Sequence, residues 1–310
     1  MRSSATAIPT TIVRRATDAL EAPPLAAWVE DLFVGGEVTR SSGKMVPCVE
    51  IRQHVGFLLL SARVSGAASL SVERLEDETF RAYQSIGREL DARRWHAVRF
   101  WNHVPHINEL MDDGRDRYMV FNAGRYRAFC DWYGGPSEFE RHIATASGVG
   151  HHGRDLFIHC LAMEQPGAAV ENPRQVAPYH YSKRFGPLPP AFARATVLNP
   201  TEELAGRILI GGTASVRGED SVHVEDLSQQ LDETFVNLAA LVSAATQVGN
   251  GKSASLPRYR ELRAYVPNEA HFDEVTSAIG RAFPTLGRLE VLRADLCRPE
   301  LLVEIEGIAD

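Results

Sequence analysis

Short motifs recur in the same order in the two halves of the chain, and this repeat restricts the folds that it can adopt. The repeated pairs are Phe33–Gly36 with Leu209–Gly212, Asp77–Phe80 with Asp232–Phe235, and Val98–Trp101 with Leu262–Tyr265. Three matches in one order indicate an internal duplication. We therefore predict an α+β fold of two related units, with domains at residues 1–150 and 151–310 and a ligand site between their packed sheets.

Hydrophobic periodicity places the same element order, β-β-α-β-α-β, in both halves. Helices are expected at about residues 72–92, 117–133, 138–145, 227–245 and 271–283. Strands are expected at 32–34, 48–52, 57–64, 96–101, 156–161, 195–198, 207–216, 260–266, 289–294 and 301–306. Residues 1–27 and 249–255 are predicted to be irregular. The segment 164–190 is rich in proline and aromatic residues, which is typical of a loop that carries binding residues.

The charge balance argues against a nucleic-acid partner. The net charge is -7 and the pI is near 5.9, whereas a nucleic-acid surface needs a basic stripe. A few converging arginines could still bind an anionic small molecule. We expect no membrane association, because there is no apolar run long enough for a signal peptide or a membrane span.

Neither the cysteines nor the histidines form a metal-binding pattern. The four cysteines, Cys48, Cys130, Cys160 and Cys297, are far apart and form no CxxC pair. They are expected to be reduced thiols in a cytoplasmic protein. The 11 histidines contain no HExxH spacing, and no phosphate-binding loop follows Gly211–Ser215. We expect neither a metal nor a cofactor.

The last predicted strand carries the strongest candidate for acid catalysis. Leu301, Val303 and Ile305 alternate with polar positions, so that Glu304 and Glu306 project together from the opposite face. A carboxyl group beside apolar residues can have a raised pKa and act as a general acid. A solvent-exposed face is the alternative interpretation.

Arginines and phenols offer candidate binding groups for a carboxylate. Arg263 and Tyr265 share one face of their predicted strand. Arginine binds a carboxylate through two parallel hydrogen bonds. Further candidates are Arg117, Arg125 and Arg127 on a predicted helix and Tyr179, Tyr181, Lys183 and Arg184 in the long loop. Surface salt bridges remain an alternative for the arginines.

Several stretches resemble known families. Leu209–Gly212 and Leu301–Ala309 are similar to the glycine turn and the C-terminal strand of the RidA-like enamine/imine deaminases. A closer resemblance is to the chorismatases, which look like fused RidA-like units. It rests on Val98–Asn108, Arg117-Tyr118, Phe121–Arg125, Gly211–Ser215 and Cys297–Gly307. The resemblance implies two fused RidA-like (chorismate-mutase-like) units in one chain.

The chorismatase resemblance also implies a reaction. Members convert chorismate with loss of pyruvate and without a cofactor, and their catalytic glutamate matches Glu304. Cys297, together with Gly211 or its neighbour Gly212, matches the members that form 3-hydroxybenzoate; the bifunctional subgroup forms 4-hydroxybenzoate as well. The expected carboxylate ligands are Arg263 and Arg125, assisted by Tyr181 and Lys183.

Two other functions stay open from the sequence. One is RidA-like enamine/imine deamination, and the other is a non-catalytic anion-binding scaffold, which a Glu304 both solvent-exposed and far from Arg263 would favour. Because the duplication puts two units into one chain, we predict a monomer or a weak oligomer.

Overall fold

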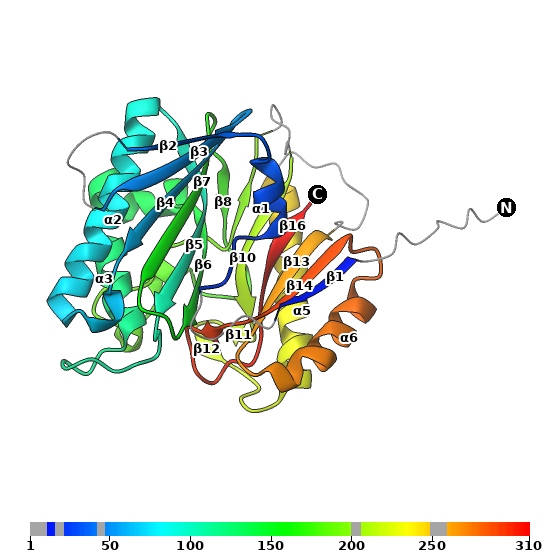
Figure 1. The fold of residues 1–310 in the computed structure, drawn as a ribbon. Helices are drawn as coiled ribbons and strands as arrows, with labels where there is room; N and C mark the ends of the chain where they lie inside the picture. The colour runs from blue at the N-terminus through cyan, green and yellow to red at the C-terminus, as the bar shows by residue number, and fades with distance from the viewer. Residues whose placement is uncertain (1–10, 16–21, 42–46, 200–205, 249–258) are drawn as a thin grey trace.

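A computed structural model describes residues 11–15, 22–41, 47–199, 206–248 and 259–310. These residues form two seven-stranded mixed sheets that face each other, with helices on the outer faces (Figure 1). The predicted α+β class is confirmed. The predicted loop at residues 249–255 lies outside the described residues.

The first sheet has the order β2-β3-β4-β7-β5-β6-β15. Its strands are β2 (Glu37–Arg40), β3 (Val49–His54), β4 (Phe57–Val64), β7 (Leu156–Met163), β5 (His96–Pro105), β6 (Thr145–His151) and β15 (Asp295–Leu296). The first sheet continues to Met163, beyond residue 150. The division of the chain into domains at residues 1–150 and 151–310 stays a prediction.

The second sheet has the order β8-β9-β10-β16-β13-β14-β1. Its strands are β8 (Ala168–Val170), β9 (Ala195–Val197), β10 (Ile208–Ala214), β16 (Glu304–Ala309), β13 (Tyr259–Val266), β14 (Arg288–Arg293) and β1 (Thr11–Arg15). A small separate hairpin joins β11 (Val216–Arg217) to β12 (Asp220–Ser221). Both large sheets contain a parallel pair at equivalent positions, β5 with β6 and β13 with β14, and the second sheet has a further parallel pair, β14 with β1.

The two sheets therefore share one strand order, and their outermost strands are exchanged between the halves. β15, from the end of the chain, pairs with β6 in the first sheet. β1, from its beginning, pairs with β14 in the second sheet. Because β1 lies in residues 1–27, the irregular segment predicted there is wrong for this part.

The helices are α1 (Ala27–Leu32), α2 (Val72–Arg93), α3 (Arg117–Tyr133), α4 (Phe139–His142), α5 (Leu227–Val248) and α6 (Phe272–Ala282). The long helices cover the outer faces of the sheets, whereas α1 packs into the seam between them. One hydrophobic core lies between α2, α3 and the first sheet, and a second between α5, α6 and the second sheet. A third cluster, which includes Trp101, Leu161 and Ile308, fills the seam between the sheets.

The helix α3 shows how local chemistry fixes an element that carries site residues. The Asp116 side chain accepts a hydrogen bond from the Met119 backbone N–H at 2.7 Å and so caps the first turn. At the other end Gly134 adopts φ 83°, the left-handed conformation that suits glycine. The predicted bounds of this helix, residues 117–133, are confirmed.

Two of the predicted elements near α1 and α4 are wrong. Residues 32–34, expected as a strand, lie at the end of α1 and in the following turn. The helix expected at 138–145 shrinks to the four residues of α4, and β6 begins at Thr145. β6 was not predicted, because Gly148 and Gly150 interrupt its hydrophobic pattern. Both positions need glycine: a Cβ at Gly148 would contact Tyr118, and one at Gly150 would overlap Ile107.

Two of the three repeated motifs occupy equivalent places. Asp77–Phe80 and Asp232–Phe235 lie in α2 and α5, and Val98–Trp101 and Leu262–Tyr265 lie in β5 and β13. The predicted equivalence of the third pair is wrong. Phe33–Gly36 precedes β2, whereas Leu209–Gly212 lies in β10, the equivalent of β4.

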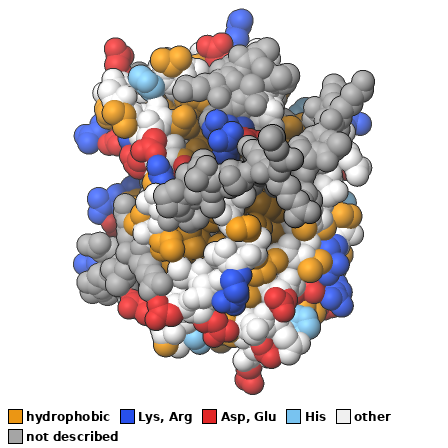
Figure 2. All heavy atoms as spheres, turned by 90° about the vertical axis from the view of Figure 1, so that its right-hand side faces the viewer, with side chains coloured by type: hydrophobic (Ala, Val, Ile, Leu, Met, Phe, Trp, Pro, Cys, Tyr) orange, Lys and Arg blue, Asp and Glu red, His pale blue; other side chains and the backbone are white. Residues whose placement is uncertain are grey.

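Charged side chains of both signs are intermixed on the face shown in Figure 2, and the described residues there form no basic stripe. None of the described helices is both long enough and apolar enough to cross a membrane.

Candidate active site

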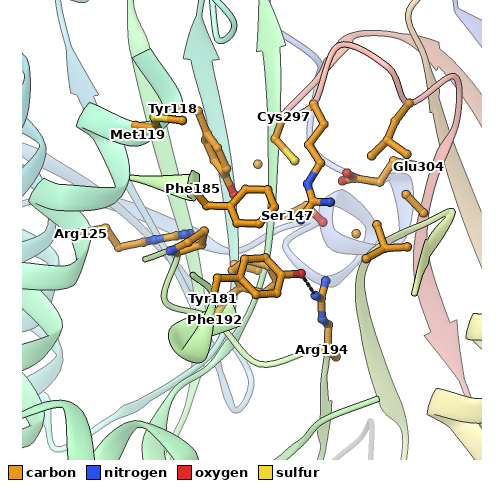
Figure 3. Close-up of a pocket in the computed structure, with 18 of the residues that line it drawn as sticks. Tyr118, Met119, Arg125, Ser147, Tyr181, Phe185, Phe192, Arg194, Cys297 and Glu304 are labelled. Carbon is orange, nitrogen blue, oxygen red and sulfur yellow. Dashed lines mark hydrogen bonds between the residues drawn. The ribbon is translucent and has the colours of Figure 1, made fainter. Parts of the chain in front are cut away.

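A pocket opens in the seam between the two sheets (Figure 3). Its walls come from α3, from β6 of the first sheet, from β10 and β16 of the second sheet, and from the loops at residues 181–194 and 297–301. The lining residues are Asp116, Tyr118, Met119, Arg125, Ala146, Ser147, Gly148, Tyr181, Phe185, Pro190, Phe192, Arg194, Gly212, Ala214, Val216, Cys297, Arg298, Leu301 and Glu304.

The two glutamates of β16 face this seam together. Glu304 is 5% exposed and Glu306 2% exposed, so the solvent-exposed alternative is wrong. Val303 and Ile305 point the other way, into the core under α5 and α6. The alternation predicted from the sequence is therefore present, although the strand begins only at Glu304.

Glu306 is held by donors on both sheets. Its Oε2 accepts hydrogen bonds from Arg99 Nη2 at 2.7 Å and from the Ser147 hydroxyl. Its Oε1 accepts from Trp101 Nε1 at 3.0 Å and from the Tyr265 hydroxyl at 3.1 Å. A carboxylate with these four donors, one of them a buried arginine, is bound as an anion.

Glu304 has the opposite environment. Burial, with a further contribution from the negative charge of Glu306, raises its pKa to about 8, although Arg99, Arg194 and Arg298 act in the other direction. Its carboxyl group is therefore protonated at neutral pH. Two glutamates two residues apart thus differ in charge, and the neutral one lines the pocket.

Gly212 makes the room that Glu304 needs. It lies in β10 beside β16, where the pairing register shifts between Ile210 and Thr213. A Cβ atom at Gly212 would overlap Glu304 Oε1. The absence of a side chain therefore leaves the Glu304 carboxyl free to face the pocket.

Arg125 brings unpaired donors into the pocket from α3. The residue is 1% exposed, and its Nη2 donates to Asn122 Oδ1 at 2.6 Å. Its Nε and Nη1 have no partner within the described residues. The guanidinium lies over the rings of Phe121 and Phe192, at 5.2 and 5.5 Å from their centroids. Buried N–H groups without a partner favour an anionic ligand.

Two further arginines converge on the opposite wall. Arg194 donates to the Tyr181 hydroxyl, and its Nε is buried without a partner among the described residues. Arg298 lies over the Phe185 ring, 4.3 Å from its centroid, and donates to Glu219 O and Ser221 Oγ. Figure 3 shows Arg125 and Arg194 approaching the pocket from different sides.

Cys297 completes the wall near Glu304. Burial, with the charge of Glu304 as a smaller cause, raises the pKa of its thiol to about 12. The group is therefore a neutral thiol at physiological pH, and no thiolate base is available here. Figure 3 shows its sulfur directed into the pocket.

Three predicted binding residues lie elsewhere. Arg263 is outside the pocket: it pairs with Glu290 at 2.9 Å and donates to Pro24 O and Leu25 O. Lys183 is exposed and does not line the pocket. Gly211 packs against Ala146 O and Arg194 O, so that the lining glycine is Gly212.

Sequence reasoning missed several lining groups, among them Arg194, Ser147 and Arg298. Arg194 and Ser147 lie in stretches with no recognisable motif, one in the segment before β9 and one in the glycine-containing strand β6. Arg298 directly follows Cys297, and its place in the matched stretch Cys297–Gly307 could have identified it. No group of histidine, cysteine and acidic residues in the described ranges could hold a metal ion.

A family model, curated relatives and a solved structure lead to the same family. The family model described as "Chorismatase FkbO/Hyg5-like, N-terminal" matches residues 36–162. A 3-hydroxybenzoate synthase from Streptomyces hygroscopicus is 34% identical over 76% of this chain and 70% of its own length. A chorismatase from the same organism is 31% identical over 79% of this chain and 68% of its own length. A crystal structure of a chorismatase aligns with a TM-score of 0.77 at 28% identity, covering 88% of this chain and 79% of the other.

Proposed function

The chain belongs to the chorismatase family, and we propose that it converts chorismate to 3-hydroxybenzoate and pyruvate in the pocket between its two sheets. The observation that carries this proposal is Glu304, a buried carboxyl with its pKa raised to about 8, which lies opposite converging arginines. The reaction begins with protonation of a carbon atom, which requires a positioned acid.

The arginines match the charges of chorismate, which carries two carboxylates. Arg125 offers two unpaired N–H groups on one side, and Arg194 offers its Nε on the other. We assign one carboxylate to each, with Tyr181 holding Arg194 in place through their hydrogen bond. Arg298 adds positive charge to the same wall.

The chemical step then follows from the position of the acid. Glu304 transfers its proton to the terminal methylene carbon of the enol ether, which becomes the methyl group of pyruvate and leaves a cation at the ether. The bond between the ether oxygen and its ring carbon then breaks, and pyruvate leaves with that oxygen as its carbonyl. The hydroxyl oxygen on the neighbouring ring carbon bonds to the vacated carbon to form an epoxide, and the hydroxyl proton returns to Glu304. The epoxide opens by cleavage of the original carbon–oxygen bond, its oxygen takes up a proton, and loss of the hydrogen from the newly oxygenated ring carbon makes the ring aromatic. Chorismate and the two products contain the same atoms, so that no water is consumed.

Cys297 and Gly212 support an aromatic product. The neutral thiol is small and a weak hydrogen-bond donor, which suits the steering of a ring intermediate without adding charge. Gly212 leaves the acid unobstructed. We therefore propose 3-hydroxybenzoate as the main product, with 4-hydroxybenzoate beside it if the chain belongs to the bifunctional subgroup.

We also propose that each half is a RidA-like unit and that the protein is a monomer or a weak oligomer in the cytoplasm. The shared strand order of the two sheets supports the first point. The site lies within one chain, so that it needs no second copy. The four free cysteines suit a reducing compartment.

The test is to incubate the protein with chorismate without any added cofactor, separate the products by chromatography and assay pyruvate. We expect 3-hydroxybenzoate and pyruvate in equal amounts, and loss of both in Glu304→Gln. Turnover that persists in Glu304→Gln would contradict the assignment of the acid, and absence of turnover in the native protein would contradict the function. The scaffold alternative required an exposed Glu304, which the structure does not have.

A further inference from the structure

A second cavity lies on the inner face of the first sheet, at the place that the duplication relates to the active-site pocket. In the second sheet Glu304 pairs with Tyr265 on β13 and with Ala214 on β10. In the first sheet His159 pairs with Trp101 on β5 and with Ser61 on β4. His159 therefore occupies the position of the catalytic glutamate, and both it and Ser61 line the second cavity.

Buried imidazoles with unused hydrogen-bonding groups form the inner part of this cavity. His103 is 1% exposed, and neither of its ring nitrogens has a partner among the described residues. His151 is 2% exposed, and its Nδ1 accepts from the Gly153 N–H at 3.0 Å. In the neutral ring the proton is then on Nε2, which also has no partner in the described part of the chain.

These rings are neutral, so that they offer both donors and acceptors. Burial lowers the pKa of His103 and His151, and it lowers that of His159 to about 4. His159 Nδ1 is hydrogen-bonded to Ser61 Oγ at 2.8 Å, which fixes its ring. His103 and His159 are 5.5 Å apart between ring centroids. A neutral hydroxyl group, which both donates and accepts, is the ligand group that satisfies such a pair.

The rim of the cavity carries an excess of positive charge. Its arginines are Arg40, Arg52, Arg63 and Arg154, and its carboxylates are Glu30, Glu50 and Asp155. Arg52 pairs with Glu30 at 2.8 Å, Arg63 pairs with Asp155, and Arg40 lies 3.9 Å from Glu50. Arg154 forms no salt bridge with a described residue. It is exposed and therefore remains available to an anion at the entrance.

An aromatic wall lies between the buried imidazoles and the charged rim of the cavity. The ring of Phe157 is parallel to that of His159, with centroids 6.3 Å apart and an interplanar angle of 3°. Phe157 lines the cavity and is half-buried. A planar ring can stack beside such a surface.

We propose that this second cavity binds a small hydroxyaryl carboxylate, with its hydroxyl on the buried imidazoles, its ring along Phe157 and its carboxylate at Arg154. The product assigned above belongs to this chemical class, so that the choice of 3-hydroxybenzoate as the probe rests on the proposed function. Binding itself is independent of turnover, because the ligand is added to the protein and need not be formed by it.

The test is an NMR titration of protein labelled with ¹³C at histidine Cε1. No histidine lines the active-site pocket, so that the signals of His103, His151 and His159 report on the second cavity alone. We expect saturable shifts of these signals with 3-hydroxybenzoate, and binding of benzoate that is weaker by about tenfold, since it lacks the hydroxyl. Arg154→Gln should weaken binding of both acids.

Variants separate the second cavity from other sites. His103→Phe keeps an aromatic ring but removes both nitrogens, and it should abolish the shifts of His159; His159→Gln provides an independent variant if His103→Phe folds poorly. His142→Gln, a change at an exposed residue outside the cavity, is the matched control and should leave the shifts unchanged.

Absence of histidine shifts in the native protein, or equal affinity for benzoate and 3-hydroxybenzoate, would overturn the proposal. Histidine shifts in a protein that does not convert chorismate would support the second binding site and contradict only the proposed function.

Discussion

The strands β7 and β16 occupy equivalent places in the two sheets, but their inner faces carry different chemistry. β16 presents Glu304 and Glu306, whereas β7 presents His159 and Leu161 at the equivalent positions. Leu161 packs into the apolar cluster of the seam, while Glu306 is held by Arg99 and Trp101 from the other half. A common framework therefore holds an acid in one half and neutral imidazoles in the other. The difference shows that the side chains, and not the strand order, determine where chemistry occurs.

The largest expected effect on activity comes from removing the acid of β16. Glu304→Gln keeps the shape of the side chain but has no proton to transfer, and we expect kcat to fall by about 10³-fold. Glu261→Gln, a change at a carboxylate of β13 outside the pocket, should leave kcat within about twofold. Both are measured as release of pyruvate from chorismate. Equal losses in the two variants would disprove the special role of β16.

Two buried arginines from the two halves should respond in different ways. Arg125→Met removes the donors that face the substrate, and we expect kcat/KM to fall by about 100-fold, because hydrogen bonds between charged groups are strong. Arg263→Met leaves Glu290 buried without its partner, and unfolding should become easier by about 3 kcal/mol with KM unchanged. Steady-state kinetics and chemical denaturation separate the two outcomes. A raised KM in Arg263→Met would show that our placement of the substrate is wrong.

The neighbouring glycines of β10 provide a finer test. A methyl group in Gly212→Ala meets the Glu304 carboxyl and displaces it, for which we expect a loss of about tenfold in kcat. In Gly211→Ala the methyl group meets backbone at Ala146 O, 2.9 Å away, so that stability should fall by about 1–3 kcal/mol instead. Activity and thermal unfolding of both variants check this. The reverse pattern would assign the lining position to Gly211.

The smallest expected effect is a change in pH dependence. The proposed reaction uses protonated Glu304, so that kcat/KM should be constant at lower pH and fall as the pH rises through about 8. Glu306→Gln removes the nearby negative charge that raises the pKa of Glu304, and the fall should therefore begin at lower pH. The kcat/KM profile of each protein between pH 5 and 10 measures the shift. A shift toward higher pH would contradict the electrostatic coupling of the two glutamates.

Local signals were sufficient for much of the fold. The helix α3 was predicted with its observed bounds because the breaker cluster Gly134-Gly135-Pro136 marks its end, and in the structure Asp116 caps its start. β6 was missed because Gly148 and Gly150 are poor strand residues, and tertiary contacts with Tyr118 and Ile107 explain their presence. Such a close approach between distant segments leaves no local pattern.

Site residues could be predicted from the sequence where the pattern of a single strand or helix determines the direction of their side chains. Alternation alone placed Glu304 and Glu306 on one face of a strand, and the structure has both facing the seam. The strand face that carries Arg263 was predicted correctly. Arg263 is in register with Glu306 on the neighbouring strand, so that both side chains lie on the face toward the seam. Its partner Glu290 comes from β14, however, and no local pattern shows which side of a strand a neighbouring strand will occupy. Arg194 was missed for the same reason, since it reaches the pocket from the long connection between β8 and β9.

The exchanged outer strands have a consequence for how the chain reaches its native state. β1 is made before the other described strands but pairs with β14, and the first sheet receives its outermost strand, β15, from residues 295–296. Neither sheet can therefore be completed on the ribosome before these late residues have emerged, and contacts of such long sequence separation form slowly. We expect the halves to mature together as one cooperative unit, so that the seam containing Glu304 closes in the same late event that completes both sheets.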